Sequence, residues 1–269
     1  MNGFRLSVLT RVIALTFIVG ALPFVINASA YARESRWFDD PHEHVGLTYG
    51  AFAKVQTSYV WRGLYAGGMN TQLDANVGYG GLYFDMWWNI GTTDWTFKTF
   101  QPEVDLTLGF SRWGVNASVV FIHNFNSPFF DFGIHPGGGG NALEIDLRYT
   151  VSSKLPLSIL WATRVSANDG YINAAGDTIR AYSSYAEISY TQRLRDGFSL
   201  YYAFGFTPWR SMYTGFQREF AVQNIEIRLT KDWSLSPHCG MSLMGQLAVN
   251  PTAPAHVINT NVAIAFYLK

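Results

Sequence analysis

The charged residues of this sequence stand singly among apolar residues, at a spacing of two. The clearest case is Asn141 to Val151, where Glu144, Asp146 and Arg148 alternate with leucine, isoleucine and tyrosine. Successive side chains of a β-strand point to opposite faces, so this stretch has one apolar and one charged face. Carboxylates and guanidinium groups that share a face can pair with one another or line an aqueous space. We expect one of these two roles for them.

The same alternation recurs from Gly46 onward in about twelve segments with no helical pattern between them. We expect the first segment to run from Leu47 to Arg62 and the tenth from Phe220 to Thr230. Many two-faced strands in succession favour a closed wall with an apolar outside and a polar inside. The sequence therefore predicts an all-β fold: a closed antiparallel transmembrane β-barrel of about twelve strands, of the outer-membrane type.

If this alternation holds, the charged faces line the lumen of the barrel. The predicted lumen-lining residues are Arg62, Asp74, Asp85, Glu103, Asp105, Glu144, Asp146, Arg148, Arg164, Glu187, Glu226 and Arg228. An unpaired charge in a partly dry lumen costs several kcal/mol, so these groups should pair. Glu144 and Arg164 fall near the outer ends of neighbouring strands, and we predict that they meet. Asp74, Glu103 and Asp105 are expected near the outer ends of theirs, which predicts an acidic external mouth.

The composition agrees with a barrel and excludes several other classes. Of 269 residues, 48% are hydrophobic, 16% are aromatic and only 14% are charged, with a net charge of +0. A soluble domain has about 25% charged residues. A nucleic-acid-binding protein usually has an excess of positive charge, and this chain has none, so its charge does not point to nucleic acid as a partner. Cys239 is the only cysteine, so no intrachain disulfide can form.

The N-terminal stretch has the features of a secretory signal peptide. Arginines precede an apolar run from Val12 to Val25, and small residues follow, with cleavage expected after Ala30 or Ala32. The predicted divisions are 1–30 signal peptide, 31–45 polar periplasmic segment and 46–269 barrel. Two histidines and three carboxylates between Asp39 and His44 could bind a divalent cation, but their spacing matches no closed site. We expect neither a metal nor a cofactor.

The connections between segments carry independent information. Short turns follow the even-numbered segments and longer loops follow the odd-numbered ones, as in outer-membrane barrels with both termini in the periplasm. Tryptophans gather near segment ends, which predicts two interfacial girdles. The outer girdle would hold Trp61, Trp88, Trp95 and Trp209, and the inner one Trp113 and Trp233.

One short motif resembles a known group of proteins. The run Ser58-Tyr59-Val60-Trp61-Arg62-Gly63 is similar to the opening of uncharacterised bacterial outer-membrane β-barrel families, in which the first strand ends in Tyr-Val-aromatic-Arg-Gly and a glycine-bearing loop follows. This resemblance implies a barrel and marks the position of Arg62. It implies no substrate.

The predicted function is a narrow, porin-like passive channel for small hydrophilic solutes in the outer membrane of a Gram-negative bacterium. A structural or adhesive barrel with a plugged lumen stays open, with the loop from Phe125 to Gly140 as its binding surface. The expected partners are outer-membrane lipid, the barrel assembly machinery during insertion, and small polar solutes.

The third hypothesis is an enzyme, a β-barrel that hydrolyses lipid. It needs a serine nucleophile and a histidine base at the outer rim. His123, Ser127 and His135 surround the longest loop without a nucleophile motif, and His238 and Ser242 fall near the opposite rim. The sequence therefore predicts no enzyme.

Overall fold

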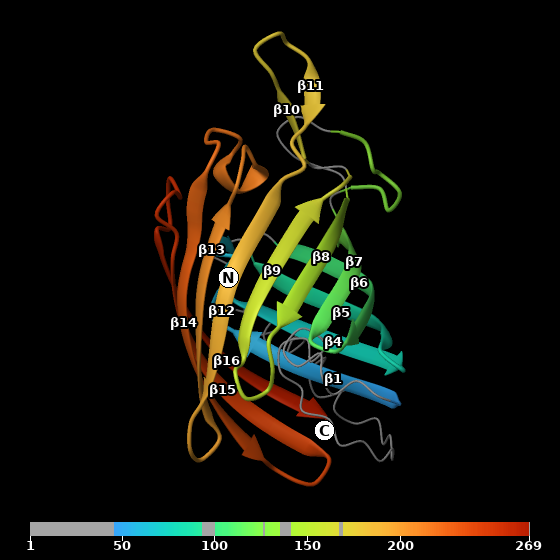
Figure 1. Ribbon diagram of the computed structural model, residues 1–269, viewed down its shortest axis with the longest axis vertical. Coiled ribbons are helices and arrows are strands. Elements are labelled where there is room, and N and C mark those ends of the chain that lie inside the picture. The colour runs from blue at the N-terminus through green and yellow to red at the C-terminus, as the bar shows by residue number, and fades with distance from the viewer. Residues whose placement is uncertain (1–45, 93–99, 126, 135–140, 167–168, 269) are drawn as a thin grey trace, which may run out of the picture.

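The protein is a closed barrel of antiparallel strands (Figure 1). The computed structural model describes residues 46–92, 100–125, 127–134, 141–166 and 169–268. The barrel strands are β1 (Leu47–Gln56), β4 (Asn70–Tyr79), β5 (Leu82–Thr92), β6 (Phe100–Arg112), β7 (Val115–Asn124), β8 (Ala142–Thr150), β9 (Leu157–Arg164), β12 (Ser184–Arg193), β13 (Phe198–Thr207), β14 (Ala221–Ser234), β15 (Cys239–Val249) and β16 (Ile258–Leu268). Pairing of β1 with β16 closes the ring of twelve, which confirms the predicted fold.

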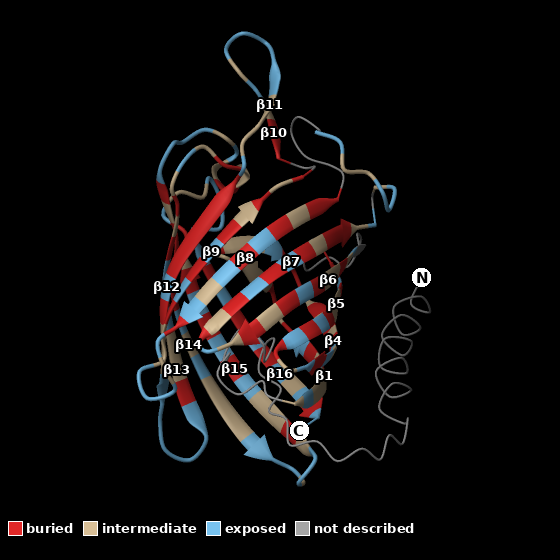
Figure 2. Ribbon diagram, turned by 45° about the vertical axis from the view of Figure 1, so that its right-hand side comes forward, coloured by how far each residue is buried: buried red, intermediate tan, exposed pale blue. Residues whose placement is uncertain are grey.

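The wall has the predicted two faces. On β8, Ile145 and Leu147 are 48% and 51% exposed, whereas Glu144 and Asp146 are 2% and 7% exposed. Figure 2 shows the same alternation of buried and exposed residues on the neighbouring strands. Large apolar side chains therefore cover the outside of the barrel, and polar ones fill its bore. Within the described residues, no helix has the length and hydropathy needed to cross a membrane.

The two ends of the barrel differ, as the loop lengths predict. One end, here called the turn end, has the short connections 80–81, 113–114, 151–156, 194–197 and 235–238. Trp113 and Gly114 show how tight these are, since both have positive φ, at 56° and 83°. The other end, the loop end, carries the hairpins β2 (Tyr59–Trp61) with β3 (Leu64–Gly67) and β10 (Gly170–Ile172) with β11 (Thr178–Arg180), and the 3-10 helix η1 (Met212–Thr214).

The predicted ends of the first and tenth strands are wrong. The first strand leaves the wall at Gln56 instead of continuing to Arg62, because Ser58 donates its hydroxyl to the carbonyl of Thr260 and its amide to the side chain of Asn261. The tenth predicted strand continues to Ser234 as β14, because residues 231–234 still pair with β15. Residues 231–234 are thus part of the wall and not of the connection that follows it.

The predicted girdles are only partly right. Trp61 lies in the bore, packed near the buried cluster of Leu160, Ala162, Tyr185 and Tyr213, and not in the outer girdle. Trp95 lies outside the described residues. Trp113 and Trp233 are exposed at the turn end, where they were expected.

Inward tyrosines lie flat against the wall where the facing strand has a glycine. A Cβ atom added to Gly109 would fall 2.5 Å from the ring of Tyr83, and one added to Gly240 would fall 2.3 Å from the ring of Tyr267. Glycine allows this close approach because it has no side chain. Large aromatic rings can therefore line the bore without crossing it.

Candidate channel constriction

The hairpin β2–β3 crosses the bore near the loop end, and we call it the constriction hairpin. At its base, the amide of Gly68 donates to the carbonyl of Thr92 over 2.7 Å. The ring of Tyr59 lies on that of Trp87 of β5, with centroids 5.7 Å apart. These contacts hold the start of the hairpin to the neighbouring wall.

The tip of the constriction hairpin reaches other parts of the wall. Arg62 and Gly63, with φ of 50° and 77°, form its two-residue turn. The side chain of Asn259 on β16 donates to the carbonyl of Gly63 over 3.2 Å. A Cβ atom on Gly63 would fall 2.1 Å from the carbonyl oxygen of Gln223 on β14. The turn is therefore wedged against β16, which is next to β1, and against β14, which lies three strands from β1 around the barrel.

Arg62 connects the tip to β8. Its guanidinium donates to both carboxylate oxygens of Glu144, over 2.9 and 2.7 Å, and lies 3.5 Å from Asp146. A two-pronged arginine–carboxylate pair is among the stronger and more directional polar contacts in proteins. The side chains of Arg62 and Glu144 are 10% and 3% exposed, so the pair is shielded from solvent.

Aromatic rings enclose the same guanidinium. Its carbon lies 4.6 Å from the ring of Trp61 and 5.1 Å from that of Tyr185. It also donates to the hydroxyl of Tyr213, which comes from η1 at the loop end. Burial raises the pKa of the Tyr213 hydroxyl, which therefore stays neutral and can accept this bond. Cation–π contacts of this kind add to the ion pair when they are shielded from water.

Glu144 and Arg164 meet, as the sequence predicts. They face each other across β8 and β9, and the Arg164 Nε lies 3.9 Å from the Glu144 Oε2. Arg164 also lies 5.6 Å from the ring of Trp61. Two guanidinium groups, one from the wall and one from the hairpin, thus share one carboxylate.

The carboxylates of β4 to β6 lie deeper than expected. Asp74 is halfway along β4 and Asp105 halfway along β6, and only Glu103 lies nearer the loop end. The predicted acidic mouth is therefore wrong for Asp74 and Asp105, because β4 and β6 begin several residues before them. Asp74 accepts a bond of 3.0 Å from Asn76, and Asp85 faces Asn76 across the β4–β5 pair.

The remaining predicted lumen residues lie across the bore. Glu187 accepts from the hydroxyls of Tyr185 and Tyr201, each over 2.6 Å. Glu226 pairs with Arg228 over 2.7 Å on the same strand. Arg148 has the parity of Glu144 and Asp146 on β8, and its Nε has no hydrogen-bond partner among the described residues. This side of the bore is mostly neutralised by its own pairs.

Sequence reasoning missed the aromatic residues of the constriction. Tyr185 has the inward parity of β12, which was a usable signal. Tyr213 comes from a loop without a periodic pattern, so nothing in the sequence places it beside Arg62.

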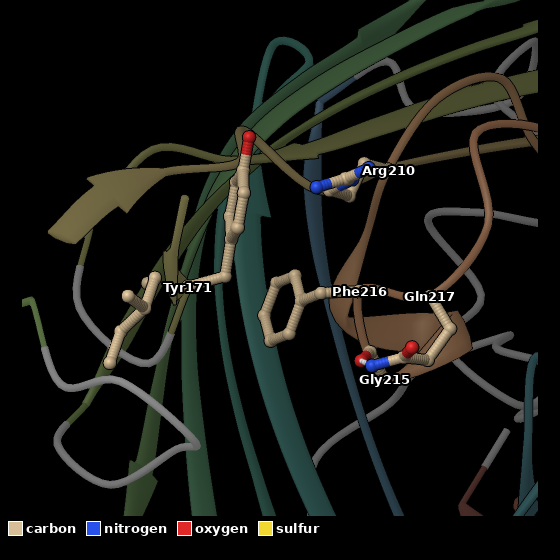
Figure 3. A pocket seen from close by; sticks show the side chains of 7 residues that line it. Tyr171, Arg210, Gly215, Phe216 and Gln217 are labelled. Carbon is tan, nitrogen blue, oxygen red and sulfur yellow. Dashed lines mark hydrogen bonds between the residues drawn. The ribbon is translucent and has the colours of Figure 1, made fainter. Parts of the chain in front are cut away.

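A pocket lies at the loop end, between β10 and the loop that holds η1 (Figure 3). The rings of Tyr171 and Phe216 stack there with centroids 5.6 Å apart. Arg210 lies 5.2 Å from the Tyr171 ring and pairs with Glu219 over 2.9 Å. The pocket belongs to the external loops and not to the bore.

The residues considered for an enzyme do not form a base and nucleophile pair within the described chain. His123 lies on the outer wall, where its Nδ1 is 2.6 Å from the Asn141 Oδ1 and its ring contacts Phe125 and Phe129. His135 lies outside the described residues.

No family model matches the chain, and the comparison with curated proteins found no match. Solved outer-membrane proteins resemble it in structure. The NanC porin has a TM-score of 0.49 and 10% identity over 82% of this chain and 100% of that one. The KdgM porin has a TM-score of 0.45 and 6% sequence identity, and the match covers 82% of this chain and 98% of the porin. An outer membrane channel from Pseudomonas putida F1 has a TM-score of 0.45 and 11% sequence identity, and the match covers 90% of this chain and 99% of that channel. The fold assignment rests on the strand pairing itself.

Proposed function

We propose that this protein is an outer-membrane β-barrel of a Gram-negative bacterium that forms a narrow passive channel for small hydrophilic solutes. The observation that carries the proposal is the opposite character of the two wall faces. Exposed leucine, isoleucine, valine and phenylalanine side chains cover the outside, and carboxylates, guanidinium groups and amides line the bore. An apolar exterior of this extent needs lipid, and a bore of charges needs water.

The constriction hairpin supports the restriction to small solutes. It extends from the base near β5 to β8, β14 and β16, so it occupies much of the cross-section near the loop end. Its tip places a guanidinium between two carboxylates. At this point the width of the bore would restrict the size of a passing solute, and the charged side chains would restrict its charge.

Planar lipid bilayers test the channel directly. Purified mature protein should insert as discrete ohmic conductance steps that are smaller than those of wide porins. Heat-modifiable migration of the barrel on gels would verify that the inserted protein is folded. A folded barrel that gives no conductance would contradict the proposal.

A structural or adhesive barrel with a plugged lumen is the second candidate. The tight contacts of the constriction hairpin favour a plugged lumen. The loop after β7 favours a binding surface, because the ring of Phe130 is 82% exposed beside that of Phe129. Deletion of residues 129–139 would abolish adhesion and leave conductance unchanged if both roles exist. A silent barrel whose loop deletion abolishes binding would support this second function instead.

Export and insertion complete the proposal. The segment 1–30 would direct secretion, and it lies outside the described residues, as does the polar segment 31–45. The assembly machinery would recognise the last strand, β16, where Phe266 points to the lipid side and is 54% exposed. Lipid contacts the belt of outward side chains.

A further inference from the structure

We infer that the bore carries small monovalent cations along one side, over the inner faces of β4, β5 and β6. This inference rests on the proposed channel function and names the class of solute. The track is built around Trp87 of β5, which faces Asp74 on β4 and Asp105 on β6. Asp85 and Asn89 flank Trp87 on its own strand at the same parity. We call these five residues the acidic track.

The acidic track has no base on its own strands. The only lysine or arginine in β4, β5 and β6 is Arg112, the last residue of β6. The alternation along β6 places Arg112 on the outer face of the barrel. Its guanidinium lies 4.6 Å from the ring of Trp113 at the turn end. Around the ring, the nearest bases on described barrel strands are Lys54 of β1 on one side and Arg148 of β8 on the other. One side of the bore is therefore negative in excess.

The unsatisfied polar atoms of the track are all oxygens. Asp85 Oδ2, Asn89 Oδ1 and Asp105 Oδ1 are buried and accept no hydrogen bond from any described residue. The side chains of Asp85 and Asn89 are only 3% and 5% exposed. Buried acceptors without a donor are costly, and a cation with part of its water shell satisfies them. Asp146, Gln223 and Asn224 elsewhere in the bore also have an oxygen without a partner in the described part of the chain. The carboxylates Glu187 and Glu226, however, accept hydrogen bonds from donors of the protein itself.

The arrangement fits a passing cation better than a resident metal. Within the described residues, no three carboxylate, histidine or cysteine side chains converge as a metal site requires. Conduction needs several weak contacts in succession, and a ladder of oxygens on neighbouring strands provides them. The indole of Trp87 adds a ring face that attracts cations. Monovalent inorganic ions such as K⁺ and small ammonium compounds match this chemistry.

The reversal potential in a KCl gradient across a planar bilayer tests the inference. The wild-type channel should prefer K⁺ to Cl⁻. Asp105→Asn and Asp85→Asn should each lower the permeability ratio, by at most about fivefold, which is the effect of one full unit charge at about 4 Å in water. Glu219→Gln removes the same charge from an exposed loop pair and should leave the ratio unchanged.

The outcomes separate the two proposals. Conductance with a preference for Cl⁻, or a K⁺ preference that survives both substitutions in folded barrels, overturns the cation track and leaves the channel intact. A folded wild-type barrel without conductance overturns the channel itself. If one aspartate variant fails to insert, the other variant and the wild-type reversal potential still decide the matter.

Discussion

At the scale of single residues, contacts of several kinds constrain the side chain of Arg62 in the bore. It is a non-glycine residue with positive φ, it makes a two-pronged pair with Glu144, and three aromatic rings surround it. A buried ion pair adds little net stability over an apolar contact of the same shape, but loss of one partner leaves a buried charge without compensation. The pair therefore determines where the hairpin sits.

Arg62→Ala should release the tip of the constriction hairpin. Removing one partner of a buried pair costs about 3–5 kcal/mol, so amides of β2 and β3 should lose protection in hydrogen exchange while the barrel strands keep theirs. Arg210→Ala is the matched control, since its pair with Glu219 is exposed and worth at most about 1 kcal/mol. Equal protection in wild type and Arg62→Ala would show that the pair does not anchor the hairpin.

At the scale of elements, the constriction hairpin depends on a close approach that only glycine allows. Gly63 combines positive φ with contact against the backbone of Gln223. The same residues, Ser58 to Gly63, carry the resemblance to uncharacterised outer-membrane barrel families, and that resemblance stays a prediction. In this protein the motif forms the turn that reaches across the bore.

Gly63→Ala should push the hairpin off β14 and expose Arg62 to trypsin. Gly80→Ala is the matched control, because Gly80 also has positive φ, at 62°, but has no atoms within 4 Å of an added Cβ. An alanine would therefore meet similar backbone strain at Gly80 and at Gly63, but only at Gly63 would its Cβ atom collide with another strand. Limited proteolysis of both folded barrels measures the difference. Resistance of Gly63→Ala to cleavage after Arg62 would contradict the wedged tip.

The pairing of tyrosine with glycine gives a second prediction at this scale. Gly240→Ala should destabilise the barrel by about 1–3 kcal/mol, because the new methyl group overlaps the ring of Tyr267. Gly245→Ala on the same strand has free space and should change stability little. Urea-driven unfolding in lipid vesicles measures both. Similar losses in the two variants would mean that the backbone, and not the ring contact, sets the cost.

Part of this architecture was predictable from the sequence, for a physical reason. Parity along a strand is a local property, so Ile145 outside and Glu144 inside follow from period-two alternation alone. The register that joins Glu144 to Arg164 also followed from a short turn between neighbouring strands. The exit of the chain at Ser58 did not, because Tyr59 and Trp61 continue the alternation. Their departure depends on bonds to β16, about two hundred residues away in sequence.

At the scale of the whole molecule, two opposed requirements meet in one wall. The outside must be apolar enough to stay in lipid, and the inside must hold charges that only water or pairing can stabilise. Ion pairs and hydrogen bonds join the charges around Arg62, Arg228 and Glu187, whereas the acidic track has no inward base on its own strands. The constriction hairpin lies over both, and in the proposed channel it sets the size of the solutes that pass.

The conductance of a barrel without the constriction hairpin tests the account most directly. Residues 59–67 would be replaced by a short glycine–serine linker, and single-channel currents compared with those of the wild type in the same salt. We predict larger conductance steps and passage of larger uncharged solutes for the shortened barrel. Conductance equal to that of the wild type would contradict the placement of the constriction in this hairpin.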